Sequence, residues 1–432
     1  MIKVNVTKLL PYFLALVLTI VVIYGPSIAG VGFISDDFTL LSNAGSHNFF
    51  SPMEGHHYSL LINTLFKLST KGVIGPPFFH GVALLLHGIN SCLILFFMTS
   101  CLDISKEKSF VSALLFAINP AGVEALVWCC AVPYTAITSI TLISMIIYAN
   151  HLSMPYSSRI STSILLTSLL ILGFLVWDWA ILILPILVAI ALLLPKKTNF
   201  LDELKLLTLP TLAFLTIVIL KKVLGMSLGY YFNSFSHVFG IIFLSPFVGI
   251  APIFSKAFYS SLIGITLALT TFSIFLWAST QSKEGLLLFT VFILSQIPQA
   301  LFGHPQSRYF YFSSFALYAT LIIAIPKFPK YALATALLTF ASIAYYRIEL
   351  WKQGSSVAQK MLEDINHAIN QHNSKIAIIN LPDTYGSESI IWKPFLWRSG
   401  RDIFRGMITD KADNHLPTYY IDANYNLIEG RP

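Results

Sequence analysis

The sequence predicts an all-α polytopic membrane protein with about eleven spans, followed by a small α/β domain at the C-terminus. Two observations predict the membrane part. Of the 432 residues, 56% are hydrophobic and only 11% are charged, whereas soluble domains carry about 25% charged residues. Apolar runs of roughly 17–25 residues, long enough to cross a bilayer as helices, recur along most of the chain. A third observation predicts the C-terminal domain, since polar residues dominate from Trp351 onward and no apolar run there is long enough to span.

The net charge of +7 is interpreted as a topology signal, because the basic residues lie mostly in short loops between apolar runs. Lys and Arg in short cytoplasmic loops set the orientation of membrane helices. We therefore expect the lipid bilayer, and no nucleic acid, as a partner of this chain. Lys3 and Lys8 precede the first apolar run and place the N-terminus in the cytoplasm, so the residues after that run emerge on the outer side.

The first span is expected at residues 9–31. The polar, aromatic stretch 32–77 is interpreted as an outer loop with one or two interfacial helices. The next spans are expected at 78–99, 110–127, 132–149, 160–176, 180–194 and 204–222. This order puts the basic loops that contain Lys106, Arg159 and Lys196 in the cytoplasm, in agreement with the positive-inside bias.

The apolar segment 237–257 contains two prolines and leaves two topologies open. If it spans, the chain has twelve spans, and Arg308 and the C-terminus face the cytoplasm. If it is re-entrant, Arg308 and the C-terminal region lie outside, and three lysines become cytoplasmic: Lys283, Lys327 and Lys330. Irregular backbone at membrane depth is tolerated where protein or a wet cavity surrounds it. The re-entrant alternative fits the charges better and gives eleven spans, the last four at 259–280, 285–303, 309–325 and 331–346.

Two domains follow from this reading. Residues 1–350 form the transmembrane domain, and residues 351–432 form a small α/β domain outside the cytoplasm. Within the second domain, 353–371 has the pattern of an amphipathic helix, 375–381 that of a buried strand, and 418–428 that of a short hairpin.

Asp36 and Asp37 are adjacent carboxylates directly after the first apolar run. Carboxylates are costly near hydrocarbon and often mark function there. The alternative is that Ser35 or Asp36 simply caps a following helix. Glu124 and Asp178 fall on the same outer side, each near a tryptophan. Four carboxylates on one face favour general-base catalysis or a bound divalent cation, either Mg²⁺ or Mn²⁺.

Four basic residues fall outside or at the outer boundary in the eleven-span topology: Lys221, Lys222, Lys256 and Arg308. Positive charge on the outer side predicts an anionic partner, and a lipid phosphate is the natural candidate. The alternative is that Lys221 and Lys222 are cytoplasmic. His80 and His87 lie seven residues apart and therefore share a helix face. They are interpreted as a structural polar stripe that faces the bundle interior, and a functional role is the alternative.

Several short motifs occur in the order found in a known family. The acid pair follows the first span, and Phe79-His80 to Leu86-His87 carries paired histidines. Asn119–Ala125 reads Asn-Pro-Ala-Gly-Val-Glu-Ala, Ser307–Tyr311 reads Ser-Arg-Tyr-Phe-Tyr, and 379–383 reads Ile-Asn-Leu-Pro-Asp. These motifs resemble membrane-integral glycosyltransferases of the GT-C fold, in particular the protein O-mannosyltransferase and tetratricopeptide-repeat mannosyltransferase group and its bacterial relatives. Two positions depart from that pattern, since His57-Tyr58-Ser59 replaces Tyr-Arg-Pro and Trp177-Asp178 replaces Lys-Glu.

The resemblance implies an inverting glycosyltransferase of the bacterial inner membrane whose active site faces the periplasm. It would transfer a sugar from a polyprenyl-phosphate donor to a glycan, lipid or protein acceptor, with O-antigen or another surface glycan favoured. Asp36 would be the general base, with Asp37 beside it in the catalytic pair. The other candidates form two groups. Expected to bind the acceptor or a cation are Glu124, Asp178 and His57, and expected to bind the donor phosphate are Arg308, Lys221 and Lys222.

A flippase or transporter of a lipid-linked sugar is the second hypothesis. Interior acids and histidines suit ion coupling in such proteins. Transporters, however, often contain inverted repeats with paired broken helices, and we find neither in the sequence.

Overall fold

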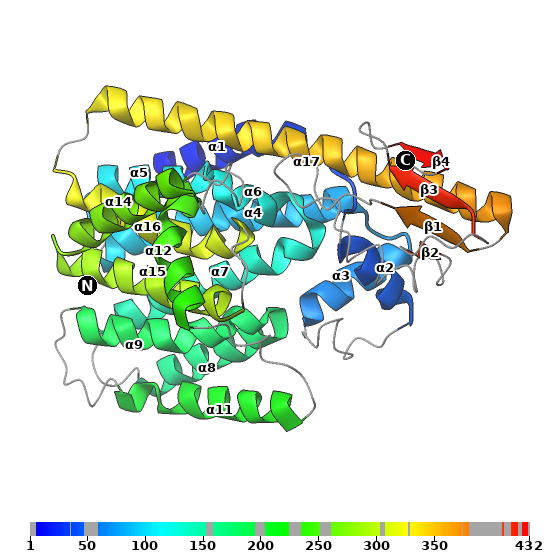
Figure 1. Cartoon of the computed structure of the whole chain (residues 1–432). Helices are drawn as coiled ribbons and strands as arrows, with labels where there is room; N and C mark the ends of the chain where they lie inside the picture. Colours follow the sequence, from blue (N-terminus) through cyan, green and yellow to red (C-terminus); the bar gives the residue numbers. More distant parts are fainter. Residues whose placement is uncertain are drawn as a thin grey trace.

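The computed structural model describes residues 6–34, 36–46, 59–152, 159–194, 204–223, 235–250, 261–302, 307–326, 329–373, 375–379, 408–409, 416–421 and 426–430. Its helices pack into a bundle. One long helix, α17 (Lys330–His372), runs along the bundle and carries a small sheet at its far end (Figure 1). The fold is predominantly helical, as the sequence predicts.

The helices before α17 fall into two series along the chain. The first series contains η1 (Val6–Lys8), α1 (Leu10–Ile28), α2 (Asp36–Ser46), α3 (Leu60–Thr70), α4 (Pro76–Phe96), the π-helical turn η2 (Phe97–Cys101), α5 (Lys106–Ala117), η3 (Pro120–Gly122), α6 (Val123–Val127), η4 (Cys129–Ala131) and α7 (Val132–His151). The second contains α8 (Arg159–Val176), η6 (Asp178–Leu182), α9 (Ile183–Leu193), α11 (Thr208–Val223), α12 (Phe235–Ile250), α14 (Leu262–Ser279), α15 (Lys283–Phe302), η7 (Ser307–Tyr309) and α16 (Phe310–Ala324).

Several of these helices are long and apolar enough to cross a membrane. Four stretches of the described residues meet that criterion by length and composition: Pro76–Cys101, Cys129–His151, Leu262–Ser279 and Tyr331–His372. A fifth is added if the bent pair Lys106–Ala117 and Pro120–Val127 counts as one span. Other apolar helices are shorter, so the count of eleven stays a prediction. The same holds for re-entrance at 237–257, since α12 covers its first part and residues 251–260 lie outside the described residues.

The bend of 44° between α5 and α6 has a local cause. Pro120 has no N–H with which to continue the helix. Asn119 turns the chain instead, and its side chain accepts a hydrogen bond from the backbone N–H of Ala121 at 3.0 Å. The hydroxyl of Tyr318 on α16 donates to the same side-chain oxygen at 2.7 Å. The break holds the short helix α6, and with it Glu124, at one end of the bundle.

A buried polar stripe ties the centre of the bundle together. His87 on α4 bonds the hydroxyl of Tyr311 at 2.7 Å and the backbone carbonyl of Ala117 at 3.0 Å. Asn90 donates to the carbonyl of Thr135 at 2.9 Å and accepts from Ser139 at 2.6 Å. These bonds join α4, α5, α7 and α16. Polar side chains inside a span normally pair with neighbouring helices in this way.

Two hydrogen bonds show which charged residues lie at each end of the bundle. At one end, the ammonium group of Lys108 at the start of α5 donates to the carbonyl of Ile323 at the C-terminal end of α16, at 2.8 Å. At the other end, Glu124 bonds the backbone N–H of Arg308, directly before α16, at 3.2 Å. Arg308 therefore lies at the same end as Glu124, opposite the basic loop at Lys106.

Helix α17 is continuous through the domain boundary that the sequence predicts at residues 350 and 351. Its 43 residues extend over about 64 Å, roughly twice the hydrocarbon thickness of a bilayer. The sequence predicts a separate amphipathic helix at 353–371, but the segment contains no proline and only one glycine, Gly354, so nothing ends the helix at the boundary. It ends at Asn373, which adopts the left-handed conformation with φ of 45°.

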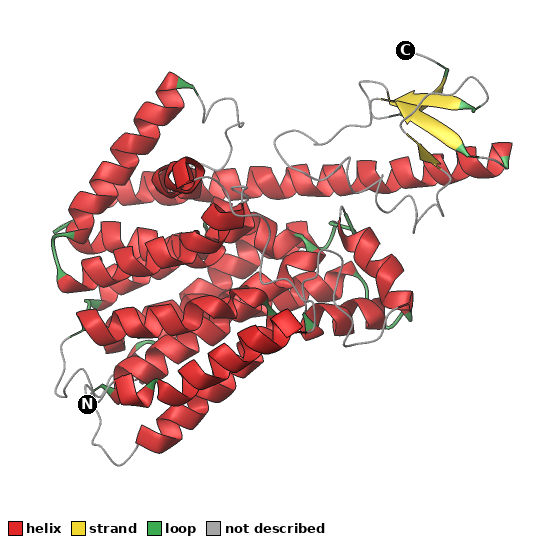
Figure 2. Cartoon of the chain, turned by 60° about the horizontal axis from the view of Figure 1, so that its bottom comes forward, coloured by secondary structure: helices red, strands yellow, loops and turns green. Residues whose placement is uncertain are grey.

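Four short strands form a sheet beside the second half of α17 (Figures 1 and 2). They are β1 (Ile376–Ile379), β2 (Ile408–Thr409), β3 (Thr418–Ile421) and β4 (Leu427–Glu429), in the order β2-β1-β3-β4. The pairs β1–β2 and β1–β3 are parallel, with Ile376 opposite Ile408 and Ile378 opposite Tyr419, whereas β3–β4 is antiparallel. The strand and hairpin expected from the sequence are present at β1 and at β3–β4.

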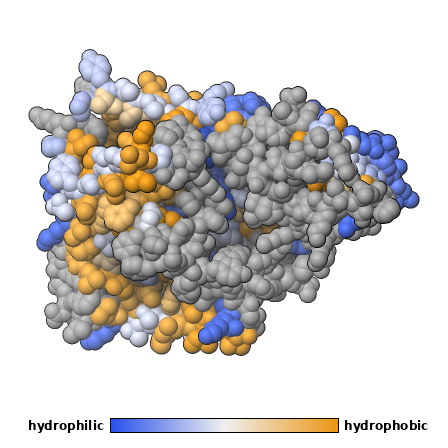
Figure 3. Space-filling model, in the orientation of Figure 1, coloured by the Kyte–Doolittle hydropathy of each residue, from blue (hydrophilic) through white to orange (hydrophobic). Residues whose placement is uncertain are grey.

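The sheet and α17 share a small apolar core. Met361 and Ile365 of the helix pack with Ile378 and Tyr419 of the sheet, and Phe38 of α2 packs against the same core. Figure 3 shows hydrophobic residues gathered over part of the bundle and hydrophilic ones at the end near the sheet. The sheet therefore lies at the same end of the molecule as the acid pair.

Candidate functional site

Asp37 is a buried anchor at the start of α2. Its side chain is 0% exposed. One carboxylate oxygen accepts from the backbone N–H of Ile34 at 3.0 Å, and the other accepts from that of Cys130 at 2.8 Å. Burial raises the pKa of the Asp37 carboxyl well above its ordinary range, and the two N–H donors oppose that rise. Asp37 thus ties the acid turn to the segment Trp128–Cys130.

Asp36 precedes this anchor and remains partly exposed. The two carboxyl groups are close enough for the charge of Asp36 to contribute to the raised pKa of Asp37. The alternative that Ser35 or Asp36 caps the helix stays a prediction, since Ser35 lies outside the described residues. It is Asp37, in the first turn of α2, that bonds back to the backbone N–H of Ile34. Asp36 is the member of the pair that a substrate can reach.

Glu124 and Arg308 form an ion pair near the same segment. One oxygen of Glu124 accepts from the Arg308 guanidinium, and the other accepts from the Ser307 hydroxyl and from the backbone N–H of Arg308. The pair is largely buried, with side-chain exposures of 12% for Arg308 and 10% for Glu124. The guanidinium lies 4.4 Å from the ring centroid of Trp128 and 5.0 Å from that of Tyr309, both within cation–π distance.

Trp128–Cys130 is the segment that joins the acid pair, Asp36 and Asp37, to the Glu124–Arg308 ion pair. Asp37 bonds its Cys130 N–H, and Arg308 stacks on its Trp128. Cys130 also lies within electrostatic range of Asp36 and Arg308. A carboxylate that can accept a proton and a guanidinium that can bind an anion therefore lie around one short segment.

Asp178 and Lys221 form a second ion pair. Asp178 lies between Trp177 and Trp179 in the chain, and both rings pack against Tyr134, with centroids at 5.5 Å and 5.4 Å. Trp179 also stacks on Tyr309 at 5.4 Å and 22°. An aromatic cluster thus connects the Asp178–Lys221 pair with Arg308. In both ion pairs, a carboxylate that was predicted to bind the acceptor or a cation bonds a basic residue that was predicted to bind the donor phosphate. The pairs are Glu124 with Arg308 and Asp178 with Lys221.

The remaining candidates lie elsewhere. Lys222 is exposed on α11, His87 belongs to the polar stripe, and His80 bonds the carbonyl of Val31 at 3.0 Å. His57 lies outside the described residues. Within the part of the chain that the structure describes, no group of three His, Cys, Asp or Glu side chains is arranged to hold a metal ion.

Arg347 is a residue of the site that the sequence analysis missed. It lies on α17 and is 2% exposed. Its guanidinium donates to the carbonyl of Pro120 at 2.6 Å and to the hydroxyl of Ser307 at 3.1 Å, and its charge acts on Glu124. The available signal was an arginine directly after the predicted span 331–346, since an ionisable residue at membrane depth often marks function.

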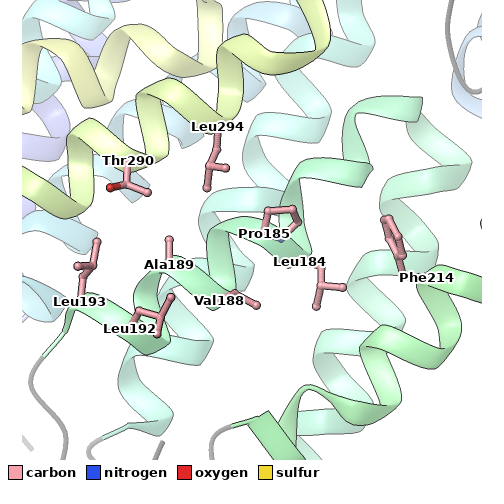
Figure 4. A pocket seen from close by; sticks show the side chains of 9 residues that line it. All are labelled: Leu184, Pro185, Val188, Ala189, Leu192, Leu193, Phe214, Thr290 and Leu294. Atoms are coloured by element: carbon pink, nitrogen blue, oxygen red, sulfur yellow. The ribbon is translucent and has the colours of Figure 1, made fainter. Parts of the chain in front are cut away.

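An apolar groove opens between α9, α11 and α15 (Figure 4). Its volume is about 510 Å³. Thr290 is its polar member, and the other lining residues are Leu184, Pro185, Val188, Ala189, Leu192, Leu193, Phe214 and Leu294. The groove begins in the first turn of α9, directly after η6, which contains Asp178. Its walls suit an apolar chain.

Comparison with known proteins leaves the function to be argued from this geometry. No protein-family model matches the chain, and no curated protein or solved structure matches it.

Proposed function

We propose that the protein is an inverting glycosyltransferase that transfers a sugar from a polyprenyl-phosphate donor to an acceptor hydroxyl. The observation that carries the proposal is the approach of Asp36–Asp37 and Arg308 to one segment, Trp128–Cys130. General-base catalysis needs a carboxylate that substrate can reach, and a leaving phosphate needs a nearby cation. The site offers both at the end of an apolar bundle.

The proposed reaction assigns a role to each of these groups. The Asp36 carboxylate takes the proton of the acceptor hydroxyl as its oxygen attacks the anomeric carbon of the sugar. The bond from that carbon to the phosphate oxygen breaks on the opposite face, and the electron pair leaves with polyprenyl phosphate. Arg308 stabilises the charge that develops on the phosphate. The Arg308 guanidinium has five N–H donors. One of its nitrogens donates to the Glu124 carboxylate, which leaves other N–H groups for the phosphate of the lipid donor.

A lipid-linked donor also suits the rest of the molecule. The groove between α9, α11 and α15 offers apolar walls to an isoprenoid chain. Trp179, which stacks on Tyr309 beside Arg308, lies in η6, directly before the helix α9 that lines the groove. We place the site on the periplasmic side of a bacterial inner membrane, because the basic loop at Lys106 lies at the opposite end. O-antigen or another surface glycan is the favoured acceptor.

Turnover of a defined donor tests the proposal. Purified protein in nanodiscs is supplied with undecaprenyl-phosphate glucose, or the same lipid carrying other hexoses or pentoses, and with lipopolysaccharide as acceptor. Free undecaprenyl phosphate is expected to appear together with sugar on the acceptor. A different result identifies a flippase. In that case every lipid-linked sugar of the panel remains intact, and the protein, reconstituted in sealed vesicles, moves the lipid-linked sugar from one leaflet to the other.

The orientation is tested by reporter fusions. The sheet packs against Phe38 of α2, so we expect the C-terminus on the side of the acid pair, outside the cytoplasm. A reporter that is active only in the cytoplasm should be silent when fused after Pro432 and active when fused after Pro326, at the Lys108 end of α16. An active reporter at Pro432 contradicts the orientation and the periplasmic site.

A further inference from the structure

One face of α17 contacts each segment that carries the candidate site. Arg347, Trp351 and Ser355 follow one another at four-residue spacing, so they lie on one face of the helix. Arg347 bonds the Pro120 carbonyl and the Ser307 hydroxyl. The rings of Trp351 and Trp128 are 6.0 Å apart. The Ser355 hydroxyl accepts from the backbone N–H of Gly32 at 3.2 Å.

These three contacts reach different parts of the site. Pro120 begins the break that carries Glu124, whereas Ser307 directly precedes Arg308. Trp128 is the ring on which Arg308 stacks. Gly32 lies in the turn that leads to Asp36. Gln359, one helical turn beyond Ser355, packs against Gly32, and a Cβ added at residue 32 would lie 1.8 Å from the side-chain amide nitrogen of Gln359.

We propose that Arg347 is a positioning residue and that α17 acts as a template that sets the position of Asp36 relative to Arg308. The expected effect of Arg347 on turnover rests on the glycosyltransferase function proposed above. The positioning role itself rests only on the contacts that α17 makes. The two segments that Arg347 holds are far apart in the sequence. Within the described part of the chain, the hydrogen bonds that join them directly all go to the Glu124 side chain. The guanidinium adds two further bonds to the same junction.

The chemistry of the contact requires a forked donor. One guanidinium nitrogen bonds a carbonyl, and the other bonds a hydroxyl. The same hydroxyl donates to Glu124, so Arg347 also fixes which way Ser307 points its proton. A lysine can make one of these bonds at a time but not hold both in a fixed geometry.

Kinetics of Arg347→Met and Arg347→Lys test the role in turnover. Methionine fills much of the space but removes both bonds. Because small displacements of catalytic groups cost roughly 100-fold, Arg347→Met is expected to lower kcat by that order while the KM for the lipid donor stays within about threefold. Arg347→Lys, which cannot hold both bonds at once, is expected to recover kcat only in part. Tyr345→Ala, at a position on α17 that is 56% exposed, is the matched control and should leave both constants unchanged.

A second measurement does not depend on activity. Cys129 is fully buried in the segment between Trp128 and Ala131. In a Cys92→Ala, Cys101→Ala, Cys130→Ser background, its maleimide labelling reports opening of that segment. Arg347→Met is expected to accelerate labelling by roughly 10- to 100-fold, as the loss of a buried bond to a charged group implies, whereas Tyr345→Ala should leave the rate unchanged.

The outcomes separate the two proposals. Faster labelling in Arg347→Met supports the positioning role. If the wild-type protein also releases no undecaprenyl phosphate, the positioning role stands and the proposed glycosyltransferase function is contradicted. Unchanged labelling in Arg347→Met overturns the positioning role whatever the turnover. A rise in donor KM with unchanged kcat also overturns it, because that result makes Arg347 a donor ligand.

Discussion

Asp36→Asn is expected to abolish sugar transfer. Asparagine keeps the size and shape of the side chain but accepts no proton at neutral pH. General-base catalysis typically contributes 10²–10⁴-fold to a rate, so we expect a loss of roughly that size in kcat for release of undecaprenyl phosphate. Membrane insertion and donor binding should be retained, because Asp36 is partly exposed and the adjacent Asp37 makes the buried anchoring bonds. The measurement is single-turnover transfer at saturating donor.

Asp37→Asn is the comparison that separates chemistry from anchoring. Its amide can accept at only one atom, so one of the N–H groups of Ile34 and Cys130 loses its bond. We expect a stability loss of about 1–3 kcal/mol, the typical cost of leaving a buried polar group without its partner, measured by thermal unfolding in detergent. Asp36→Asn should lower the unfolding temperature less than Asp37→Asn does, because Asp36 is partly exposed. Activity of Asp36→Asn within about tenfold of wild type would remove Asp36 from the role of base.

Arg308→Ala is expected to weaken donor use strongly. The guanidinium is largely buried, stacks on Trp128 and Tyr309, and pairs with Glu124. Hydrogen bonds to charged groups are worth about 1.5–3 kcal/mol, which predicts a fall of roughly 10- to 150-fold in kcat/KM for the donor. Arg308→Lys keeps the charge but lacks the fork that matches phosphate oxygens, so we expect it to restore activity only in part.

The double variant Arg308→Ala with Glu124→Gln controls for the carboxylate that Arg308→Ala leaves buried without its partner. Breaking a buried pair is destabilising because of the remaining charge, and the second change removes that charge. If the double variant regains stability but not donor affinity, Arg308 binds the phosphate. If it regains both, the guanidinium serves only to neutralise Glu124, and the phosphate role passes to Lys221 and Lys222.

Local patterns in the sequence were sufficient to predict much of the architecture. The apolar composition predicts a helical membrane protein, which agrees with the several apolar helices long enough to cross a bilayer. A short apolar run closed by Pro382-Asp383 predicts β1, and the segment 418–428, with Asn424 near its turn, predicts the β3–β4 hairpin. These features depend on residues that are close in the chain, where helix and strand periodicity can be read directly.

The sequence also singled out Asp36, Asp37, Glu124 and Arg308 as separate candidates, because charges near hydrocarbon are conspicuous. It could not assign partners to them. Only the tertiary structure shows that Asp37 is the anchor, and that Glu124 and Asp178 each bond a predicted phosphate ligand. The sequence analysis also missed Arg347, whose position directly after the predicted span 331–346 was the available signal.

The sequence by itself determined the class of the protein, the apolar segments and the types of side chain available at the candidate site. The tertiary structure decided which of them meet, by bending the chain at Asn119-Pro120 and by continuing α17 past the predicted boundary. Arg347 and Pro120 are 227 positions apart. Contacts over such a separation depend on the register in which whole helices pack, and helix packing is set by the shapes of many side chains together, which no local pattern encodes.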